Sequence, residues 1–492
     1  MNAKVFVETK EPGPIIDPKL FGHFIENMGR GIYQGGLISS DGRIRTEIID
    51  ALKGMKVSVL RWPGGLFADG YHWQDGIGKD RPVRPNIYWK RLGPLMGPKD
   101  PNYFGTHEFL DLCDRLDAEP YLNVNLGSGT PEEAASWVQY CNGSQESRWG
   151  KVRSSNNRLN PWNVKIWGIG NEIFGWWSIG HTDPFAYSKK YLEFYEAMMS
   201  EDQSIKPVLV GTCDLWPDWN PIVLTQTAGK ASYLSFHVYL PGNEPKYLFM
   251  AVPGTASNHY SLASAYFELD RKIRFVSDQI RYVLGKDSGL KIALDEWNLW
   301  WWWPQAYKVW WKMRDAISLA GMAGVLVEHC EDVEMSNLAQ AINVLGLLNT
   351  NYRQVVATPL YYVMQMFAST MIGRRLKCKV DVSTYQSKKL GGIPAQNAAP
   401  FVSAHAAVEG SGVGIILVQR NYNGPVTIEI ESPGVVFDKV SILSGPSPEA
   451  KNTFANPKLV RIYDSAPKEC KGGLTLHLPA ACVAAVKGDL TA

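Results

Sequence analysis

The stretch VKIWGIGNE, residues 164–172, is mostly apolar up to Gly170 and then ends in the polar pair Asn171 and Glu172. A short apolar run of this kind is typical of a strand that is buried on both faces of a parallel sheet. A second stretch, KIALDEWN at residues 291–298, has the same form and contains Asp295 and Glu296. Both stretches therefore predict buried strands that deliver carboxylates at their C-terminal ends.

Six further runs of the same kind bring the number of predicted buried strands to eight. They are LFGHFIEN (20–27), VSVLRW (57–62), PYLNVNLG (120–127), PVLVGT (207–212), YLSFHVY (233–239) and VEMSNLAQ (333–340). Segments with helical periodicity lie between them, for example 105–118, 130–143 and 183–202. Eight strands that alternate with helices predict an α/β fold, a (β/α)₈ TIM barrel.

The pattern changes after about residue 370 to short alternating runs that are separated by Gly, Pro, Asn and Ser. These runs are VSAHAAVE, VGIILVQRN, PVTIEIES, GGLTLHLPA and CVAAVKG. Alternation of this kind predicts antiparallel strands, so we expect a barrel over 16–369 and a C-terminal antiparallel β-sandwich over 370–492. The strand-like run AKVFVET precedes the barrel, and we expect residues 1–15 to contribute a strand to the sandwich.

Composition excludes several classes of protein. The 50 Lys and Arg balance 48 Asp and Glu, and no basic run of five or more occurs, so no nucleic-acid partner is expected. Neither an N-terminal leader nor an apolar run of about 18 residues is present, which predicts a cytoplasmic protein without a membrane partner. The seven Cys are scattered without a C-x-x-C pair, so we expect reduced thiols.

Aromatic residues are abundant, with 18 Trp and 22 Tyr in the chain. Aromatic rings can lie flat against the apolar face of a sugar, although a Trp-rich core explains the composition equally well. The four consecutive residues Trp300–Trp303 cannot all be buried on a single face of a strand or helix. We expect the segment Trp297–Trp303 to form a loop beyond its strand, with Trp300 at the rim of a sugar pocket.

The ends of the predicted strands carry the chemistry. In a (β/α)₈ barrel the C-terminal ends of the strands form the active site, so Glu172 and Glu296 can face each other across its mouth. Glycoside hydrolysis needs such a pair, with one carboxyl group protonated and the other ionised. Side chains alternate along a strand, so we expect Asp295 to point away from the mouth as a structural neighbour. Other polar strand ends are Glu26, Arg61, Asn171, His237, Tyr239 and Gln340.

Several cofactor motifs are absent from the sequence. GIGNE lacks the third glycine of a nicotinamide fingerprint, and neither a phosphate loop nor an H-E-x-x-H metal cluster occurs. We therefore expect no metal and no organic cofactor.

Five blocks of sequence resemble glycoside hydrolase family 51, whose usual members are α-L-arabinofuranosidases. They run in order from about residue 20 to 350: GHFIENMGRGIY, RWPGGLFADGYHWQDGIG, NVNLGSGTPEEAASWVQYCN, KIWGIGNEIFGWWSIGH and LDEWNLWW. The resemblance implies a (β/α)₈ barrel with a β-sandwich and a double displacement that retains anomeric configuration. It implies that Glu172 is the acid/base and Glu296 the nucleophile.

The resemblance also implies roles for the other strand ends. Arg61 would support the nucleophile and His237 would buttress the site, while the positions that bind furanose hydroxyls are Glu26, Asn171, Tyr239 and Gln340. The sequence departs from the family at Leu66, where Asn or Cys commonly contacts the sugar. Members of the family commonly form homo-oligomers, often hexamers.

These observations predict a retaining, exo-acting α-L-arabinofuranosidase that releases arabinose from arabino-oligosaccharides or hemicellulose side chains. One alternative is an endo-β-glucanase or xylanase of the same family, for which an extended aromatic platform would suit a chain-like substrate. The other alternative is a carbohydrate-binding protein without catalytic activity.

Overall fold

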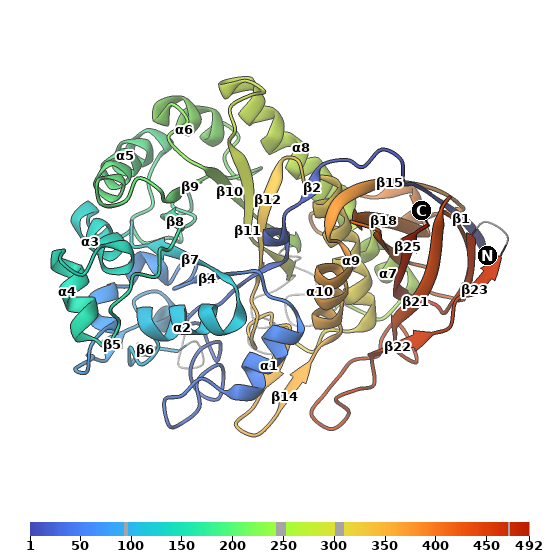
Figure 1. Cartoon of the computed structure of the whole chain (residues 1–492), viewed down its shortest axis with the longest axis horizontal. Coiled ribbons are helices and arrows are strands. Elements are labelled where there is room, and N and C mark those ends of the chain that lie inside the picture. The colour runs from blue at the N-terminus through green and yellow to red at the C-terminus, as the bar shows by residue number, and fades with distance from the viewer. Residues whose placement is uncertain (93–96, 243–251, 301–308, 471–472, 492) are drawn as a thin grey trace.

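Eight parallel strands close into a barrel, which occupies the left and centre of Figure 1. The computed structural model describes residues 1–92, 97–242, 252–300, 309–470 and 473–491. The barrel strands are β3 (Gly22–Phe24), β4 (Val59–Trp62), β7 (Glu119–Val124), β8 (Ile166–Ile169), β9 (Lys206–Val210), β10 (Tyr233–Pro241), β11 (Lys291–Trp300) and β12 (Val333–Ala339). Pairing of β12 with β3 closes the ring, so the predicted (β/α)₈ barrel is confirmed.

Helices follow the strands around the outside of the barrel (Figure 1). They are α1 (Thr46–Gly54), α2 (Thr106–Leu116), α3 (Pro131–Asn142), α4 (Arg148–Ser155), α5 (Pro184–Glu201), α6 (Trp219–Thr227), α7 (Ala256–Ala263), α8 (Ala265–Leu284), α9 (Met313–Glu328) and α10 (Pro359–Thr370). Side chains of Thr130 and Asp183 cap α3 and α5 just before a proline, a common helix start. The three helices predicted from periodicity are therefore confirmed within about two residues at each end.

One layer of buried side chains fills the interior of the barrel near the N-terminal ends of its strands. Seven buried residues, one from each strand except β3, form this layer: Val59, Tyr121, Ile166, Val208, Tyr233, Ala293 and Met335. Each comes from the first half or the centre of its strand, so the layer packs the N-terminal part of the barrel. A polar site is therefore expected at the C-terminal mouth.

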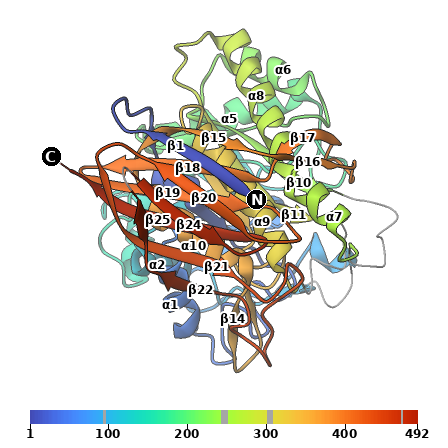
Figure 2. The same cartoon turned by 90° about the vertical axis from the view of Figure 1, so that its right-hand side faces the viewer.

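The C-terminal residues form an 11-stranded sheet that receives the first strands of the chain (Figure 2). Its strands are β1 (Asn2–Glu8), β2 (Ile15–Ile16), β15 (Gly373–Val382), β18 (Val402–Glu409), β19 (Gly412–Gln419), β20 (Val426–Glu431), β21 (Val435–Ser444), β22 (Arg461–Ser465), β23 (Lys468–Cys470), β24 (Gly473–Leu478) and β25 (Cys482–Leu490). The start of β15 pairs with β18 and its remainder pairs with β1, so this strand belongs to both layers around one apolar core.

The pairs that the C-terminal strands make with one another in this sheet are antiparallel, as predicted. The added strand β1 is antiparallel to β15 on one edge and parallel to β20 on the other. The small strands β16 (Thr384–Ser387) and β17 (Gln396–Pro400) form a separate hairpin.

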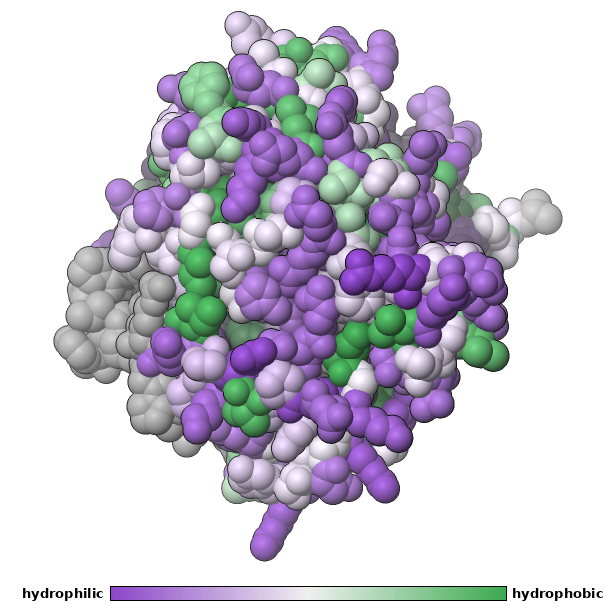
Figure 3. Space-filling model, turned by 90° about the vertical axis from the view of Figure 1, so that its left-hand side faces the viewer, coloured by the Kyte–Doolittle hydropathy of each residue, from purple (hydrophilic) through white to green (hydrophobic). Residues whose placement is uncertain are grey.

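Three further features concern the helices, the cysteines and the surface. Among the described residues, no helix has the length and apolar character that a membrane span requires. The six cysteines with described side chains are free: Cys113, Cys141, Cys213, Cys330, Cys378 and Cys482. On the face of the molecule shown in Figure 3, hydrophobic side chains are scattered among hydrophilic ones.

Candidate active site

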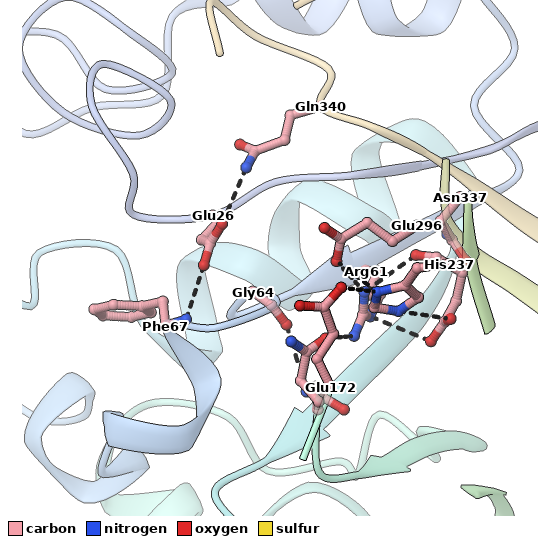
Figure 4. A network of polar contacts seen from close by, with 12 residues as sticks. Glu26, Arg61, Gly64, Phe67, Glu172, His237, Glu296, Asn337 and Gln340 are labelled. Atoms are coloured by element: carbon pink, nitrogen blue, oxygen red, sulfur yellow. Dashed lines mark hydrogen bonds and ion pairs between the residues drawn. The ribbon is translucent and has the colours of Figure 1, made fainter. Parts of the chain in front are cut away.

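The two predicted catalytic glutamates meet at the mouth of the barrel (Figure 4). One oxygen of Glu172 and one oxygen of Glu296 lie within 4.8 Å of each other. Retaining glycosidases place their carboxyl groups about 5–5.5 Å apart, whereas inverting enzymes need about 6.5–9.5 Å to admit a water molecule. The observed separation therefore fits a retaining arrangement.

The backbone after β8 turns sharply to present Glu172. Gly170 has a φ of +94° and Glu172 itself has a φ of +45°. The left-handed region is uncommon for residues other than glycine, and such strain often accompanies a functional position. The hydroxyl group of Ser178 donates a hydrogen bond to the Glu172 carbonyl at 2.8 Å, which holds the turn in place.

Two donors hold the carboxylate of Glu296. The hydroxyl group of Tyr239 donates to Oε1 at 2.6 Å, and Nη1 of Arg61 donates to Oε2 at 3.2 Å. Arg61 is only 1% exposed, and its Nη2 also donates to Oδ1 of Asn171 at 2.7 Å. Arg61 therefore connects the strand that carries Glu296 with the turn that carries Glu172.

Both carboxyl oxygens of Glu172 also have partners. Nδ1 of His237 lies 2.8 Å from Oε1, and the indole N–H of Trp177 donates to Oε2 at 2.6 Å. The indole reaches Glu172 because it lies over Gly175, where an added Cβ would be 2.3 Å from the ring. The role of Trp177 as a donor could not be predicted from the sequence.

His237 lies between three carboxylates. Its Nε2 is 3.2 Å from Oδ1 of Asp295. Its Nδ1 is 2.8 Å from Oε1 of Glu172 and 3.6 Å from Oε2 of Glu296. Asp295 is a neighbour of the site, as expected, but the expectation that its side chain points away is wrong. A register shift between Leu294 and Trp297 interrupts the alternation of β11, so both acidic side chains reach His237.

Asp295 lies beneath the mouth as a buried anion. The hydroxyl group of Tyr121 donates to its Oδ2 at 2.8 Å, and Nε of Arg61 lies 3.6 Å from the same oxygen. Burial opposes ionisation, but the charge of Arg61 and the contact with His237 outweigh it and lower the pKa of Asp295. Asp295 therefore supplies a fixed negative charge below His237.

The protonation of the site is centred on His237. Burial disfavours the charged imidazole, but the charge of Glu296 and the contacts with Asp295 and Glu172 raise the pKa of His237 to about 10. Burial also opposes ionisation of Glu172, yet the hydrogen bond and charge of His237 lower the pKa of this carboxyl group. In Glu296, burial exceeds the opposing charge of His237 and the pKa is raised.

These pKa directions differ from the expectation that the carboxyl group of the acid/base, Glu172, is protonated. The pKa directions favour a proton on His237 and an ionised carboxyl group on Glu172. Because Nδ1 of His237 and Oε1 of Glu172 are 2.8 Å apart, the proton is one hydrogen bond away from the predicted acid.

Glu26 and Gln340 form a second polar group at the same mouth (Figure 4). Oε1 of Glu26 accepts hydrogen bonds from the Phe67 amide at 2.8 Å and the Trp89 indole at 3.1 Å. Its Oε2 accepts one from Nε2 of Gln340 at 3.0 Å. Burial, followed by the charge of Glu296, raises the pKa of Glu26 to about 8. Trp89 was not predicted, because it begins a short 3-10 helix that has no regular position relative to the strands.

The turn after β4 runs between these two groups. A Cβ added to Gly64 would lie 2.7 Å from Cγ of Glu26, and one added to Gly65 would lie 2.9 Å from Oε2 of Glu296. Both glycines therefore permit close approach of the backbone to carboxylates. The half-buried Leu66 follows directly and precedes Phe67, so the residue that departs from the family pattern belongs to the turn that lines the site.

The tryptophans near Glu296 divide into two groups. Trp297 was expected to lie in a loop, but it is fully buried in β11 and its indole donates to Ser336. The strand extends to Trp300 because β10 pairs with it along its whole length, up to Pro241. Trp300 is half-buried and packs edge-on against Tyr239 with ring centroids 5.1 Å apart, whereas Trp301–Trp303 lie outside the described residues.

Among the described residues, Glu172, His237 and Glu296 also bring one ligand atom each within 4.8 Å of one another, as a metal site would need. A cation there would lie beside the positive charge of Arg61, whose Nη1 is 3.2 Å from Glu296. The same atoms are already paired with one another, as acid–base chemistry requires.

Comparison with known proteins gives a consistent assignment. Residues 51–247 match the model of the alpha-L-arabinofuranosidase 1 domain, and residues 295–481 match the alpha-L-arabinofuranosidase C-terminal domain. Alpha-L-arabinofuranosidase C of Emericella nidulans is 32% identical, over 76% of this chain and 75% of that protein. The intracellular exo-alpha-L-arabinofuranosidase of Bacteroides ovatus is 29% identical, over 97% and 94% of the two chains.

A solved structure extends this similarity to the whole fold. The thermostable GH51 alpha-L-arabinofuranosidase of Thermotoga petrophila superposes with a TM-score of 0.88 and is 29% identical. The superposition covers 99% of this chain and 100% of the other.

Proposed function

The chain belongs to the α-L-arabinofuranosidases of glycoside hydrolase family 51, and we propose that it is exo-acting and releases arabinose from arabino-oligosaccharides or hemicellulose side chains. The assignment of Glu172 and Glu296 as the catalytic pair rests on one observation. Their carboxyl oxygens lie within 4.8 Å of each other at the C-terminal ends of the barrel strands.

In the first step, Glu296 attacks the anomeric carbon and forms a covalent glycosyl ester. The bond to the glycosidic oxygen breaks, and its electron pair remains on the oxygen, which takes a proton from Glu172. Tyr239 and Arg61 hold Glu296 in place with hydrogen bonds of 2.6 and 3.2 Å, and these bonds orient the nucleophile.

We propose that the proton used by Glu172 comes from His237. The raised pKa of His237 supports an imidazole that holds the proton before the reaction, and the 2.8 Å contact supports transfer from Nδ1 to Oε1 once bound substrate has changed the charges around the pair. In the second step, the ionised Glu172 removes a proton from water, which attacks the anomeric carbon and releases Glu296.

The remaining candidates are proposed to bind the furanose. Nδ2 of Asn171 is buried and has no partner among the described residues, so it is available as a donor to a sugar hydroxyl. Glu26 and Gln340 offer acceptor and amide groups at the opposite wall, and Trp300 offers an apolar edge beside Tyr239.

The alternative activities have less support. Solved structures of a family 44 xyloglucanase and of a glucanase-xylanase share only 10% and 13% identity with this chain, so they show the fold alone. The named relatives with higher identity are all α-L-arabinofuranosidases.

We also propose that the enzyme acts in the cytoplasm as a homo-oligomer. The name of the Bacteroides ovatus relative supports an intracellular role, and the family resemblance supports assembly. Light scattering on the purified protein tests the assembly, and cell fractionation tests the location.

The activity is tested with an aryl α-L-arabinofuranoside, an aryl β-xyloside and a soluble β-glucan, with product configuration followed by NMR. Rapid turnover of the first substrate with retained configuration is expected. Glu296→Ala should lose turnover by more than about 10⁴-fold because it lacks the nucleophile. Glu429→Gln, at an exposed position of the C-terminal sheet, is the control. Turnover of the glucan alone, or inverted product, would reject the proposal.

A further inference from the structure

Trp176 is among the most exposed aromatic residues of the protein. Its side chain is 80% exposed, and among the large hydrophobic residues that the structure describes, Tyr282 alone exceeds it at 88%. Single exposed apolar residues are normal at protein surfaces, so exposure by itself indicates nothing. The position of Trp176 does, because it lies four residues after Glu172 in the turn that presents the acid/base.

Hydrogen bonds fix the backbone on both sides of Trp176. The amide of Gly175 donates to the carbonyl of Glu172 at 2.7 Å, and the amide of Ser178 donates to the carbonyl of Gly175 at 2.9 Å. The exposed ring is therefore carried by a tight, hydrogen-bonded turn. A backbone that is held in advance loses little conformational entropy when the ring binds a ligand.

Trp176 lies one ring away from the catalytic carboxyl group. Its ring centroid is 5.8 Å from that of Trp177, and the two planes meet at 80°. Trp177 in turn donates its N–H to Oε2 of Glu172 at 2.6 Å. Two contacts therefore connect the Glu172 carboxyl group, through Trp177, with Trp176 at the surface.

The acid/base of a glycosidase stands beside the leaving-group oxygen, so the surface beyond Glu172 faces the part of the substrate that is released. We propose that Trp176 is a stacking platform for the first sugar unit of the leaving group, which is a pyranose or furanose ring of the hemicellulose chain. This inference rests on the proposed function and adds to it the residue that recognises the polymer.

The chemistry of the site favours a neutral sugar over a protein partner. An indole face matches the C–H face of a sugar ring, and one ring has about the area of one sugar unit. A stable protein interface buries about 800 Å² on each partner, far more than one ring supplies. Trp216 is the next exposed tryptophan. Among the ring contacts of the described chain, it is connected to Trp176 only through Trp219, Phe174 and Trp177, so the two exposed indoles do not touch each other.

The test compares two substrates that share the arabinofuranose but differ in the leaving group. One is methyl α-L-arabinofuranoside, and the other is xylotriose that carries one α-L-arabinofuranosyl branch. For Trp176→Ala we expect kcat/KM on the branched xylotriose to fall about tenfold, equivalent to about 1.4 kcal/mol. On the methyl glycoside it should change less than about twofold, because the methyl group does not reach the ring.

Matched variants separate stacking from damage to the fold. Trp176→Phe keeps a ring and should restore most of the activity on branched xylotriose. Tyr282→Ala removes an equally exposed aromatic side chain near the C-terminal end of α8, whose following strand enters the barrel at its N-terminal end, and should match the wild type on both substrates.

The outcomes are distinguishable. Equal loss on both substrates, or no loss on either, would overturn the platform. A change in molecular mass of Trp176→Ala by light scattering would also overturn it, because the ring would then belong to an interface between copies of the chain. Failure of the wild type to cleave either arabinofuranoside would instead reject the proposed function, before any variant is made.

Discussion

Nδ1 of His237 lies 2.8 Å from Oε1 of Glu172, and the pKa directions of the two groups place the shared proton on the imidazole. The carboxylate of Asp295 behind the ring, 3.2 Å from Nε2, stabilises this charge. The acid/base therefore operates as one member of a buried hydrogen-bonded set, and its titration is a property of the set.

This arrangement predicts the pH behaviour of His237→Gln. With a neutral amide in place of the imidazole, the proton must reside on Glu172, whose carboxyl group loses it at a lower pH than an imidazole of pKa about 10. The basic limb of the kcat/KM profile should therefore move to lower pH by more than about one unit. An unmoved basic limb in an active, folded variant would show that His237 does not hold the proton.

Removal of the acid should depend on the leaving group. General acid catalysis contributes about 10²–10⁴-fold, so Glu172→Ala should lose about that factor in kcat on a branched oligosaccharide, which needs protonation. On an aryl arabinofuranoside with an acidic phenol the loss should be much smaller in the glycosylation step, measured as a pre-steady-state burst. Equal losses in glycosylation of both substrates would contradict the assignment of Glu172.

Leu66 offers a test of sugar recognition. It occupies the turn between Gly65, which approaches Glu296, and Phe67, which donates to Glu26. Leu66→Asn places an amide in this turn, and one added hydrogen bond of about 0.5–1.5 kcal/mol predicts a two- to tenfold gain in kcat/KM. Leu66→Met preserves the apolar character and serves as the control. A gain in Leu66→Met as large as in Leu66→Asn would show that the amide makes no such contact.

A buried histidine outside the site should control stability in acid. His23 is fully buried, neither ring nitrogen has a partner among the described residues, and burial lowers its pKa to about 3. Between its unfolded value of about 6.5 and this folded value, the unfolded chain binds the extra proton, so stability is present above pH 6.5 and is lost as pH falls.

The consequence is measurable by urea unfolding at two pH values. Between pH 7 and pH 5, the wild type should lose about 2 kcal/mol more unfolding free energy than His23→Leu, which has no group to titrate. Identical pH dependence in the two proteins would mean that His23 is not buried as a neutral ring.

The sequence was sufficient for the barrel but not for every strand of the sandwich. Barrel strands are buried on both faces and appear as continuous apolar runs, so all eight were predicted. The strand β15 was missed, although Leu376, Cys378, Val380 and Val382 alternate with charged residues. Its high charge content masked an alternation of period two, which is the pattern of a strand with one exposed face.

The site divides in a similar way. Glu26, Arg61, His237 and Gln340 were predictable because strand ends meet at one mouth. The role of Asp295 was not, because a register shift in β11 cancels the alternation on which the prediction depended. Trp89 and Trp177 were not assigned as donors either, because loop conformation determines which carboxylate an indole N–H reaches.

The position of β1 has a consequence for protein synthesis. This strand is synthesised long before its two neighbours, β15 and β20, which begin only at Gly373 and Val426. During translation the apolar side chains of Ala3, Val5 and Val7 therefore have no native partners until the whole barrel has been made. The nascent chain must keep this segment from aggregating until then, and its capture joins strands from distant parts of the polypeptide in one core.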